Sequence, residues 1–186
     1  MKTRKSLISP SDANVSSQTT ELQTIALEMA GNSDRACVLL CGAMLDQALE
    51  ELLRHHFRKT SGAGEDAIND LLTRRPLPPL GSFTVRAKIA YLMGLIDGGL
   101  CKSLMKFTNI RNEFAHKAVP PPLTTELLAP VFATLPKSIK DLTEKFRTIF
   151  EMTPSKSLSR SRTELLHVLN ALSMGIHFSQ EKLRDK

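Results

Sequence analysis

Apolar residues recur every three or four positions along most of this chain, which is the spacing of one face of an α-helix. No stretch alternates apolar and polar residues for long enough to predict a β-strand. We therefore predict an all-α protein that forms a single helical bundle of about seven to eight helices. A length of 186 residues is sufficient for one such domain with a buried core.

Residues that favour helix ends divide this pattern into elements. Gly31-Asn32 is a common helix stop, Ser33 or Asp34 suits the cap of the next helix, and Ser82 opens another. The predicted helices cover residues 20–30, 34–59, 65–74 and 82–96, the stretch from Gly99 to the vicinity of His116, and residues 124–134, 137–152 and 162–184.

Three regions differ in composition. Residues 1–18 are polar and rich in Ser and Thr, which predicts a disordered N-terminal arm. Residues 19–152 contain most of the helical pattern and form the predicted main domain. Residues 153–186 begin with a linker that contains Ser and Pro, and they end in a helix that we expect to pack on the bundle.

The longest predicted helix, residues 34–59, carries the most continuous apolar stripe and is the expected central helix. The stripe consists of Val38, Cys41, Leu45, Leu49, Leu52 and His56. Asp46 lies on the same helix face as Leu53 and Phe57, where a solvated residue is not expected. This carboxylate is therefore a candidate partner for a buried cation.

Reactive side chains gather in one short segment, Arg111-Asn112-Glu113-Phe114-Ala115-His116. The three residues Pro120, Pro121 and Pro122 prevent its helix from continuing far beyond. Arg111 continues an apolar stripe formed by Leu100, Leu104, Phe107 and Phe114. A guanidinium buried there without a partner would be destabilising, so we expect Arg111 to pair with Asp46.

Two interpretations of this segment remain open. As a catalytic site, Arg111 would hold a phosphate and His116 would transfer a proton, which suits metal-independent cleavage of RNA. Asn112 and Asp46 would orient them. The five residues between Arg111 and His116 turn a straight helix by about 140°, so convergence needs a distorted helix end or a second subunit. As a structural site, Arg111 pairs with Asp46, Asn112 bonds the backbone and His116 caps its own helix.

A second candidate site lies at the entry of the helix that begins near Ser82. The proline-rich connection at residues 76–79 is stiff, and the helix after it carries Arg86 and Tyr91. We predict a partner-binding rim that contains Arg86 and Tyr91, together with Arg111 and His116. The alternative is that the prolines only stiffen a crossing between helices and that the charged residues face solvent.

A formal net charge of +6 would suit a nucleic acid, because Lys and Arg displace counterions from phosphate. Many of the basic residues lie near the two ends of the chain, and there is no Trp and one Tyr to stack on bases. We therefore interpret most of this charge as a solvated surface, with DNA or RNA kept as an alternative partner.

Three cysteines, Cys37, Cys41 and Cys101, form no even-numbered disulfide framework, which favours reduced thiols and a cytoplasmic setting. No apolar run reaches the length that spans a membrane. We expect no metal, because His55 and His56 lie about four helical turns from Cys37 and Cys41. We expect no cofactor, and no phosphate-binding loop or hydrolase motif is present.

A family resemblance rests on three stretches in order: Pro79-Leu80-Gly81-Ser82-Phe83 with Arg86 beyond it, Ala90-Tyr91-Leu92-Met93-Gly94-Leu95-Ile96, and Ile110-Arg111-Asn112-Glu113-Phe114-Ala115-His116. The chain resembles the bacterial mannitol operon repressor family over about residues 33–135, including the helix at Leu45–Leu49. The resemblance implies an all-helical regulator of transcription that lacks a recognised DNA-binding motif and acts through a protein partner. We expect a homodimer.

A broader resemblance is to the HEPN superfamily, which is marked by an Arg followed by a polar residue and, a few residues later, by a His. Arg111, Asn112 and His116 match that pattern. It implies, as an alternative function, a metal-independent ribonuclease in a toxin–antitoxin or defence setting, with two motifs meeting across a dimer. We favour a non-enzymatic regulator of the mannitol-repressor type.

Overall fold

This computed structural model describes residues 24–60, 62, 64–74, 76–151 and 158–184. The described part of the chain contains eight helical segments and no strand. The predicted fold class, an all-α bundle of about seven to eight helices, is confirmed. The arm expected at residues 1–18 lies outside the described residues. None of the described helices is long and apolar enough to cross a membrane.

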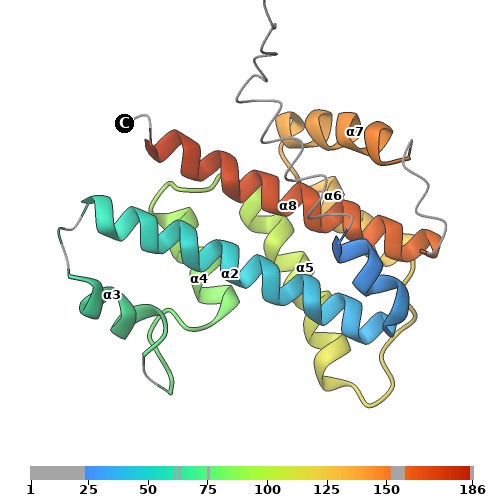
Figure 1. The fold of residues 1–186 in the computed structure, drawn as a ribbon, viewed down its shortest axis with the longest axis horizontal. Coiled ribbons are helices and arrows are strands. Elements are labelled where there is room, and N and C mark those ends of the chain that lie inside the picture. The colour runs from blue at the N-terminus through green and yellow to red at the C-terminus, as the bar shows by residue number, and fades with distance from the viewer. Residues whose placement is uncertain (1–23, 61, 63, 75, 152–157, 185–186) are drawn as a thin grey trace, which may run out of the picture.

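The helix boundaries agree with the sequence pattern for most elements (Figure 1). A first helical segment covers residues 24–31. It is followed by α2 (Asp34–Thr60), α3 (Glu65–Leu72), α4 (Phe83–Leu92), α5 (Gly98–His116), α6 (Thr125–Ala133), α7 (Lys137–Glu151) and α8 (Arg160–Arg184). Predicted caps are also found, because the hydroxyl of Ser33 accepts a hydrogen bond from the N–H of Ala36, and that of Ser82 from the N–H of Val85.

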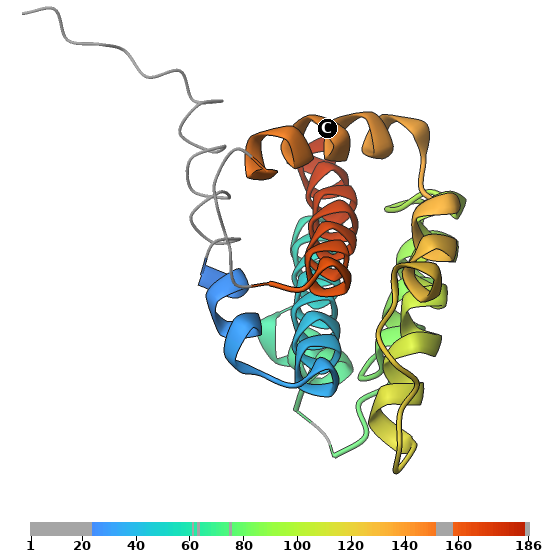
Figure 2. The same ribbon diagram turned by 90° about the vertical axis from the view of Figure 1, so that its right-hand side faces the viewer.

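Two long helices, α2 and α8, run side by side and form the most extensive contact of the bundle. Figure 2 shows α4 and α5 in a second layer beside them, with α7 lying across one end. The expected stripe of α2 lies in the core, where Cys41, Leu45 and Leu49 are fully buried. The prediction of α2 as a central helix is confirmed, but its partner α8 is equally central and carries its own buried apolar run from Leu165 to Ile176.

The start of α8 is tied to the start of α2 by Arg162. Its Nε donates to Asp34 Oδ1 at 2.8 Å, and its Nη1 donates to the carbonyl of Met29 at 2.9 Å. These two bonds join the first helical segment, α2 and α8 at one corner of the bundle. The proposed boundary at residue 152 between a main domain and a C-terminal helix stays a prediction, and residues 152–157 lie outside the described part.

The helix expected over residues 82–96 is shorter than predicted. It ends at Leu92, and Gly94 adopts a φ of +69°, a left-handed conformation that glycine accepts without strain. The side chains of Leu92 and Met93 are therefore exposed, while Ala87 and Ala90 face the core.

Close packing between α8 and its neighbours depends on Gly175. A Cβ at this position would lie 2.8 Å from Ile139 Cδ1 and 2.9 Å from both methyl groups of Leu100. These distances are below van der Waals contact, so α5, α7 and α8 approach each other only because residue 175 has no side chain.

We predict that Gly175→Val lowers the free energy of unfolding by about 1–3 kcal/mol, the usual effect of overpacking a core. Urea denaturation followed by circular dichroism measures this change. Gly31→Val is the matched control, because a Cβ at Gly31 meets nothing within 4 Å. Equal stability of the two variants would show that the α5–α7–α8 contact is not tightly packed.

Candidate functional site

Arg86 lies at the centre of a partly buried charge cluster between α2 and α4. Its side chain is almost fully buried, and the residue is 5% exposed. Nη1 lies 2.8 Å from Asp46 Oδ1, and Nη2 lies 3.0 Å from Glu50 Oε2. Asp46 and Glu50 are four residues apart on α2, so both carboxylates face the same cation.

Backbone carbonyls complete the coordination of this guanidinium. Nε of Arg86 donates to the carbonyl of Leu80 at 2.8 Å, and Nη2 donates to that of Leu72 at 3.0 Å. Leu72 ends α3, and Leu80 lies in the connection between α3 and α4, directly after the prolines of residues 76–79. One side chain therefore joins α2, α3, the connection and α4, an arrangement that we call the Arg86 clasp.

The clasp corrects two sequence predictions. Arg86 was expected on an exposed partner-binding rim, but its burial excludes it from any such surface. Asp46 was expected to pair with Arg111, but its ion-pair partner is Arg86. Burial raises the pKa of Asp46 above its usual value, although the nearby Arg86 opposes this shift.

Arg111 is exposed, although its position in the sequence continues the buried stripe of α5. Its aliphatic stem lies against α2 at Gly42, where an added Cβ would be 3.0 Å from Arg111 Cγ. Because Gly42 has no side chain, the stem packs on α2 while the guanidinium reaches the surface. There Nη1 donates to Asn112 Oδ1 at 3.1 Å, so Asn112 contacts a side chain instead of the expected backbone group.

A groove of about 380 Å³ opens beside Arg111, between the middle of α2, the start of α4 and the last turns of α5. Arg111, Asp46 and Thr108 supply polar atoms, and Phe83, Phe107 and Leu39 supply apolar walls. The remaining residues that line it are small: Gly42, Ala43, Gly81 and Ser82. Two predicted site residues, Arg111 and Asp46, thus share one groove without forming the expected ion pair.

His116 is exposed at the last position of α5 and does not line this groove. The carbonyls that follow it are bound by Arg35 of α2, whose Nη2 donates to Lys117 O at 2.7 Å and to Ala118 O at 2.9 Å. The cation at this helix end is therefore Arg35, which corrects the expectation that His116 caps its own helix.

Tyr91, Leu92 and Met93 form an exposed apolar patch at the end of α4. They are 48%, 76% and 38% exposed, respectively. Tyr91 lies beside the first residue of α5, since a Cβ at Gly98 would be 3.5 Å from its ring. We refer to these three residues as the apolar patch.

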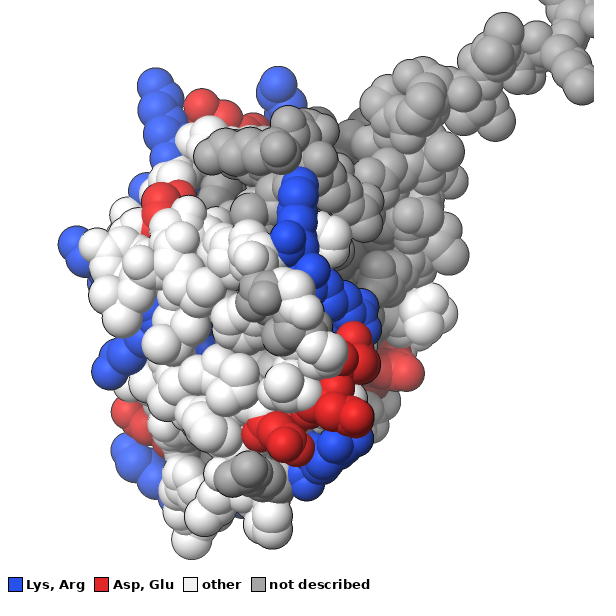
Figure 3. Space-filling model, turned by 90° about the vertical axis from the view of Figure 1, so that its left-hand side faces the viewer, with Lys and Arg blue, Asp and Glu red and all other residues white. Residues whose placement is uncertain are grey.

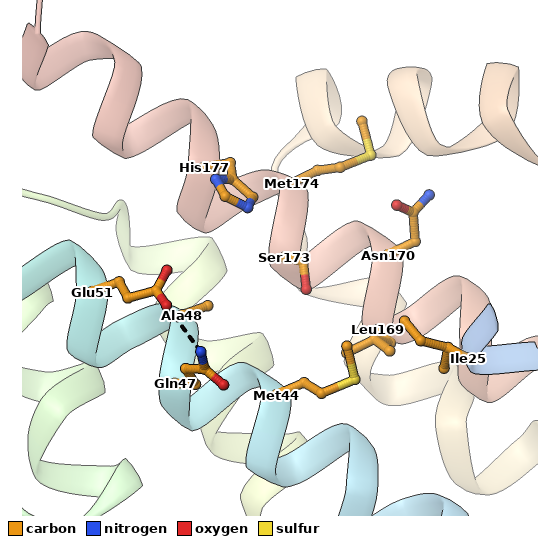
Figure 4. A pocket seen from close by; sticks show the side chains of 10 residues that line it. All are labelled: Ile25, Met44, Gln47, Ala48, Glu51, Leu169, Asn170, Ser173, Met174 and His177. Atoms are coloured by element: carbon orange, nitrogen blue, oxygen red, sulfur yellow. Dashed lines mark hydrogen bonds between the residues drawn. The ribbon is translucent and has the colours of Figure 1, made fainter. Parts of the chain in front are cut away.

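A second, smaller hollow lies between α2 and α8, with a volume of about 190 Å³ (Figure 4). Gln47 and Glu51 from α2 face Ser173 and His177 from α8, and Gln47 donates to Glu51 at 3.0 Å. The sequence pattern did not indicate this hollow. Within the described ranges, no group of three or more His, Cys, Asp or Glu side chains could hold a metal ion.

Comparison with known proteins agrees with this architecture. The family model described as mannitol repressor matches residues 27–160. The chain belongs to this family. A chain of the X-ray structure of the MtlR–HPr complex from Escherichia coli is similar in fold, with a TM-score of 0.57 and 20% sequence identity, over 83% of this chain and 97% of that chain. No curated protein matches significantly.

Membership of the mannitol repressor family confirms the family resemblance found in the sequence, whereas neither comparison supports the ribonuclease alternative. Within a single chain, the structure does not bring Arg111 and His116 together. Helix α5 is continuous through Arg111 to His116, so the distorted helix end that would bring them together in one chain is not found. Arg111 faces the groove and His116 does not.

The sequence interpretation missed two residues of this site, Arg35 and Glu50. Glu50 could have been found, because a carboxylate four residues after Asp46 on the same helix face indicates that both bind one cation. Arg35 carries no such signal, since its acceptors are backbone carbonyls 82 and 83 residues further along the chain.

We predict that Arg86→Met destabilises the protein by about 3 kcal/mol, because Asp46 and Glu50 lose the cation that offsets their burial. Chemical denaturation measures the effect. The matched control is Arg74→Met, which removes an exposed Arg that pairs with Asp66 on α3 and should leave the midpoint of unfolding almost unchanged. Similar midpoints for the two variants would contradict a structural role of the clasp.

Proposed function

We propose that this mannitol repressor family member is a transcriptional regulator that acts by binding a protein partner of the HPr type. The supporting observation is the similarity in fold, over nearly the whole of the other chain, to a chain from a complex of MtlR with HPr. Family membership supports the regulatory role. The proposal places the protein in the cytoplasm, and the free thiols of Cys37, Cys41 and Cys101 agree with a reducing compartment.

The apolar patch is the proposed contact surface for that partner. Tyr and Met are enriched in protein interfaces, and contiguous exposed apolar side chains mark interaction sites more often than isolated ones do. Figure 3 faces the side of the molecule where α3 lies and shows a broad area without Lys, Arg, Asp or Glu, bordered by both basic and acidic side chains. An uncharged area suits the desolvated centre of a protein interface better than a phosphate backbone.

Arg111 and His116 remain in the proposal as secondary partner contacts, since both are exposed. The homodimer also stays a proposal, as does direct contact with DNA. An exposed apolar patch fits a protein partner, whereas DNA binding depends on basic side chains, so the two modes respond to different substitutions.

We predict that the purified protein binds HPr from the same organism with saturating behaviour in isothermal titration calorimetry. Leu92→Glu should weaken this binding at least about tenfold, because it places a charge in the centre of a desolvated contact. Leu77→Glu is the matched control, because Leu77 is 90% exposed on the proline-rich connection and lies outside the apolar patch. Circular dichroism verifies that both variants are folded.

Absence of HPr binding at high micromolar concentration would overturn the proposed partner. Equal weakening by Leu92→Glu and Leu77→Glu would retain the partner and overturn the assignment of the apolar patch. Binding of operator DNA by the protein alone, lost at raised salt, would replace the partner-mediated function with direct DNA recognition.

A further inference from the structure

The groove beside Arg111 brings together groups that recognise a small anion. Arg111 stands on the α5 side, the first turn of α4 borders it at Ser82 and Phe83, and Asp46 lies on the α2 side. Its volume of about 380 Å³ is within the range of small-molecule sites.

Most hydrogen-bond donors of the Arg111 guanidinium have no acceptor among the described residues. A guanidinium has five N–H donors, and the one hydrogen bond that Arg111 makes to a described residue is to Asn112. Its stem is fixed against Gly42, which limits the conformational freedom that a ligand would have to remove. The fork of remaining donors is suited to two oxygens of a phosphate group.

The start of α4 adds a second source of positive potential. The N–H of Val85 donates a hydrogen bond to the hydroxyl of Ser82. The N–H groups of Phe83 and Thr84 have no acceptor within the helix. Such a helix end favours phosphate oxygens. Because Arg111 lines the same groove, an anion there would meet two sources of positive potential.

Asp46 determines which anions fit. Its Oδ1 lies 2.8 Å from Arg86 Nη1 but is buried without a hydrogen-bond partner, and no described residue donates a hydrogen bond to Oδ2. A carboxylate repels a bare dianion but accepts hydrogen bonds from hydroxyl groups. The apolar side chains of Phe83, Phe107 and Leu39 provide a surface for a carbon skeleton.

We propose that this groove binds a small hydroxylated phosphate monoester, with Arg111 and the start of α4 holding the phosphate and Asp46 accepting a hydroxyl. This inference does not depend on the proposed protein partner. The phosphate would lie nearest Arg111 and the hydroxylated skeleton would lie toward α2.

The test is a titration of the full chain with glucose 6-phosphate, glycerol 3-phosphate and inorganic phosphate at low ionic strength. Isothermal titration calorimetry gives the affinities, and ¹H–¹⁵N spectra locate the site. The amides of Gly42 and Gly81 line the groove and are the expected reporters. Both esters should bind, at least one of them about tenfold more tightly than inorganic phosphate, because only they offer hydroxyl groups to Asp46.

Two substitutions probe the groove without disturbing the clasp. Arg111→Met removes the donors and retains an aliphatic stem against Gly42, and Ala43→Trp fills the groove from an exposed position on α2. Each should weaken binding of the esters about tenfold or more. Arg74→Met is the control, because this exposed Arg lies on the surface beyond α3 and outside the groove.

Saturable binding that is lost in both groove variants and retained in the control supports the proposal. Three results would overturn it: no saturation at millimolar ester, equal affinity for the esters and inorganic phosphate, or binding that survives both Arg111→Met and Ala43→Trp. Because none of these measurements involves HPr, failure here would leave the proposed partner intact.

Discussion

A buried guanidinium must find acceptors for nearly all of its donors, and this requirement at Arg86 fixes the relative positions of four segments. Two carboxylates of α2 offset the charge, while carbonyls at the end of α3 and in the connection between α3 and α4 accept the remaining N–H groups. Helix α4 therefore approaches α2 in one arrangement. The groove borders the start of α4 and the apolar patch lies at its end, so both surfaces depend on the same set of bonds.

Helical periodicity was sufficient to predict the fold class and most helix limits, because the stripe of α2 from Val38 to Leu52 and the caps at Ser33 and Ser82 are local signals. Periodicity was not sufficient to predict whether Arg86 and Arg111 are buried or exposed. Periodicity assigns a residue to a helix face, but only the neighbouring helix decides whether that face is covered. Arg86 faces two carboxylates and is buried, whereas Arg111 packs its stem against Gly42 and its guanidinium reaches the surface.

At the candidate site, too, local sequence signals were predicted correctly, whereas contacts with residues distant in the sequence were not. The three stretches that end with Arg111 to His116 identified the family correctly, but the geometry of this last segment is determined by Gly42 and Arg35, which lie far earlier in the sequence. Similarly, the conformation of Gly94 ends α4 early and exposes Leu92 and Met93. From the sequence alone, Leu92 and Met93 were compatible with a position in the core, because the turn at Gly94 could not be predicted.

The side-by-side placement of α2 and α8 has a consequence for how the chain reaches its fold during synthesis. About 100 residues separate the end of α2 from the start of α8, so a ribosome that adds roughly 5–20 residues per second takes several seconds to produce the second helix after the first. Throughout that interval, the apolar surface of α2 that α8 will cover is open to other molecules. Nascent chains of this protein should therefore need protection from aggregation until their last helix emerges.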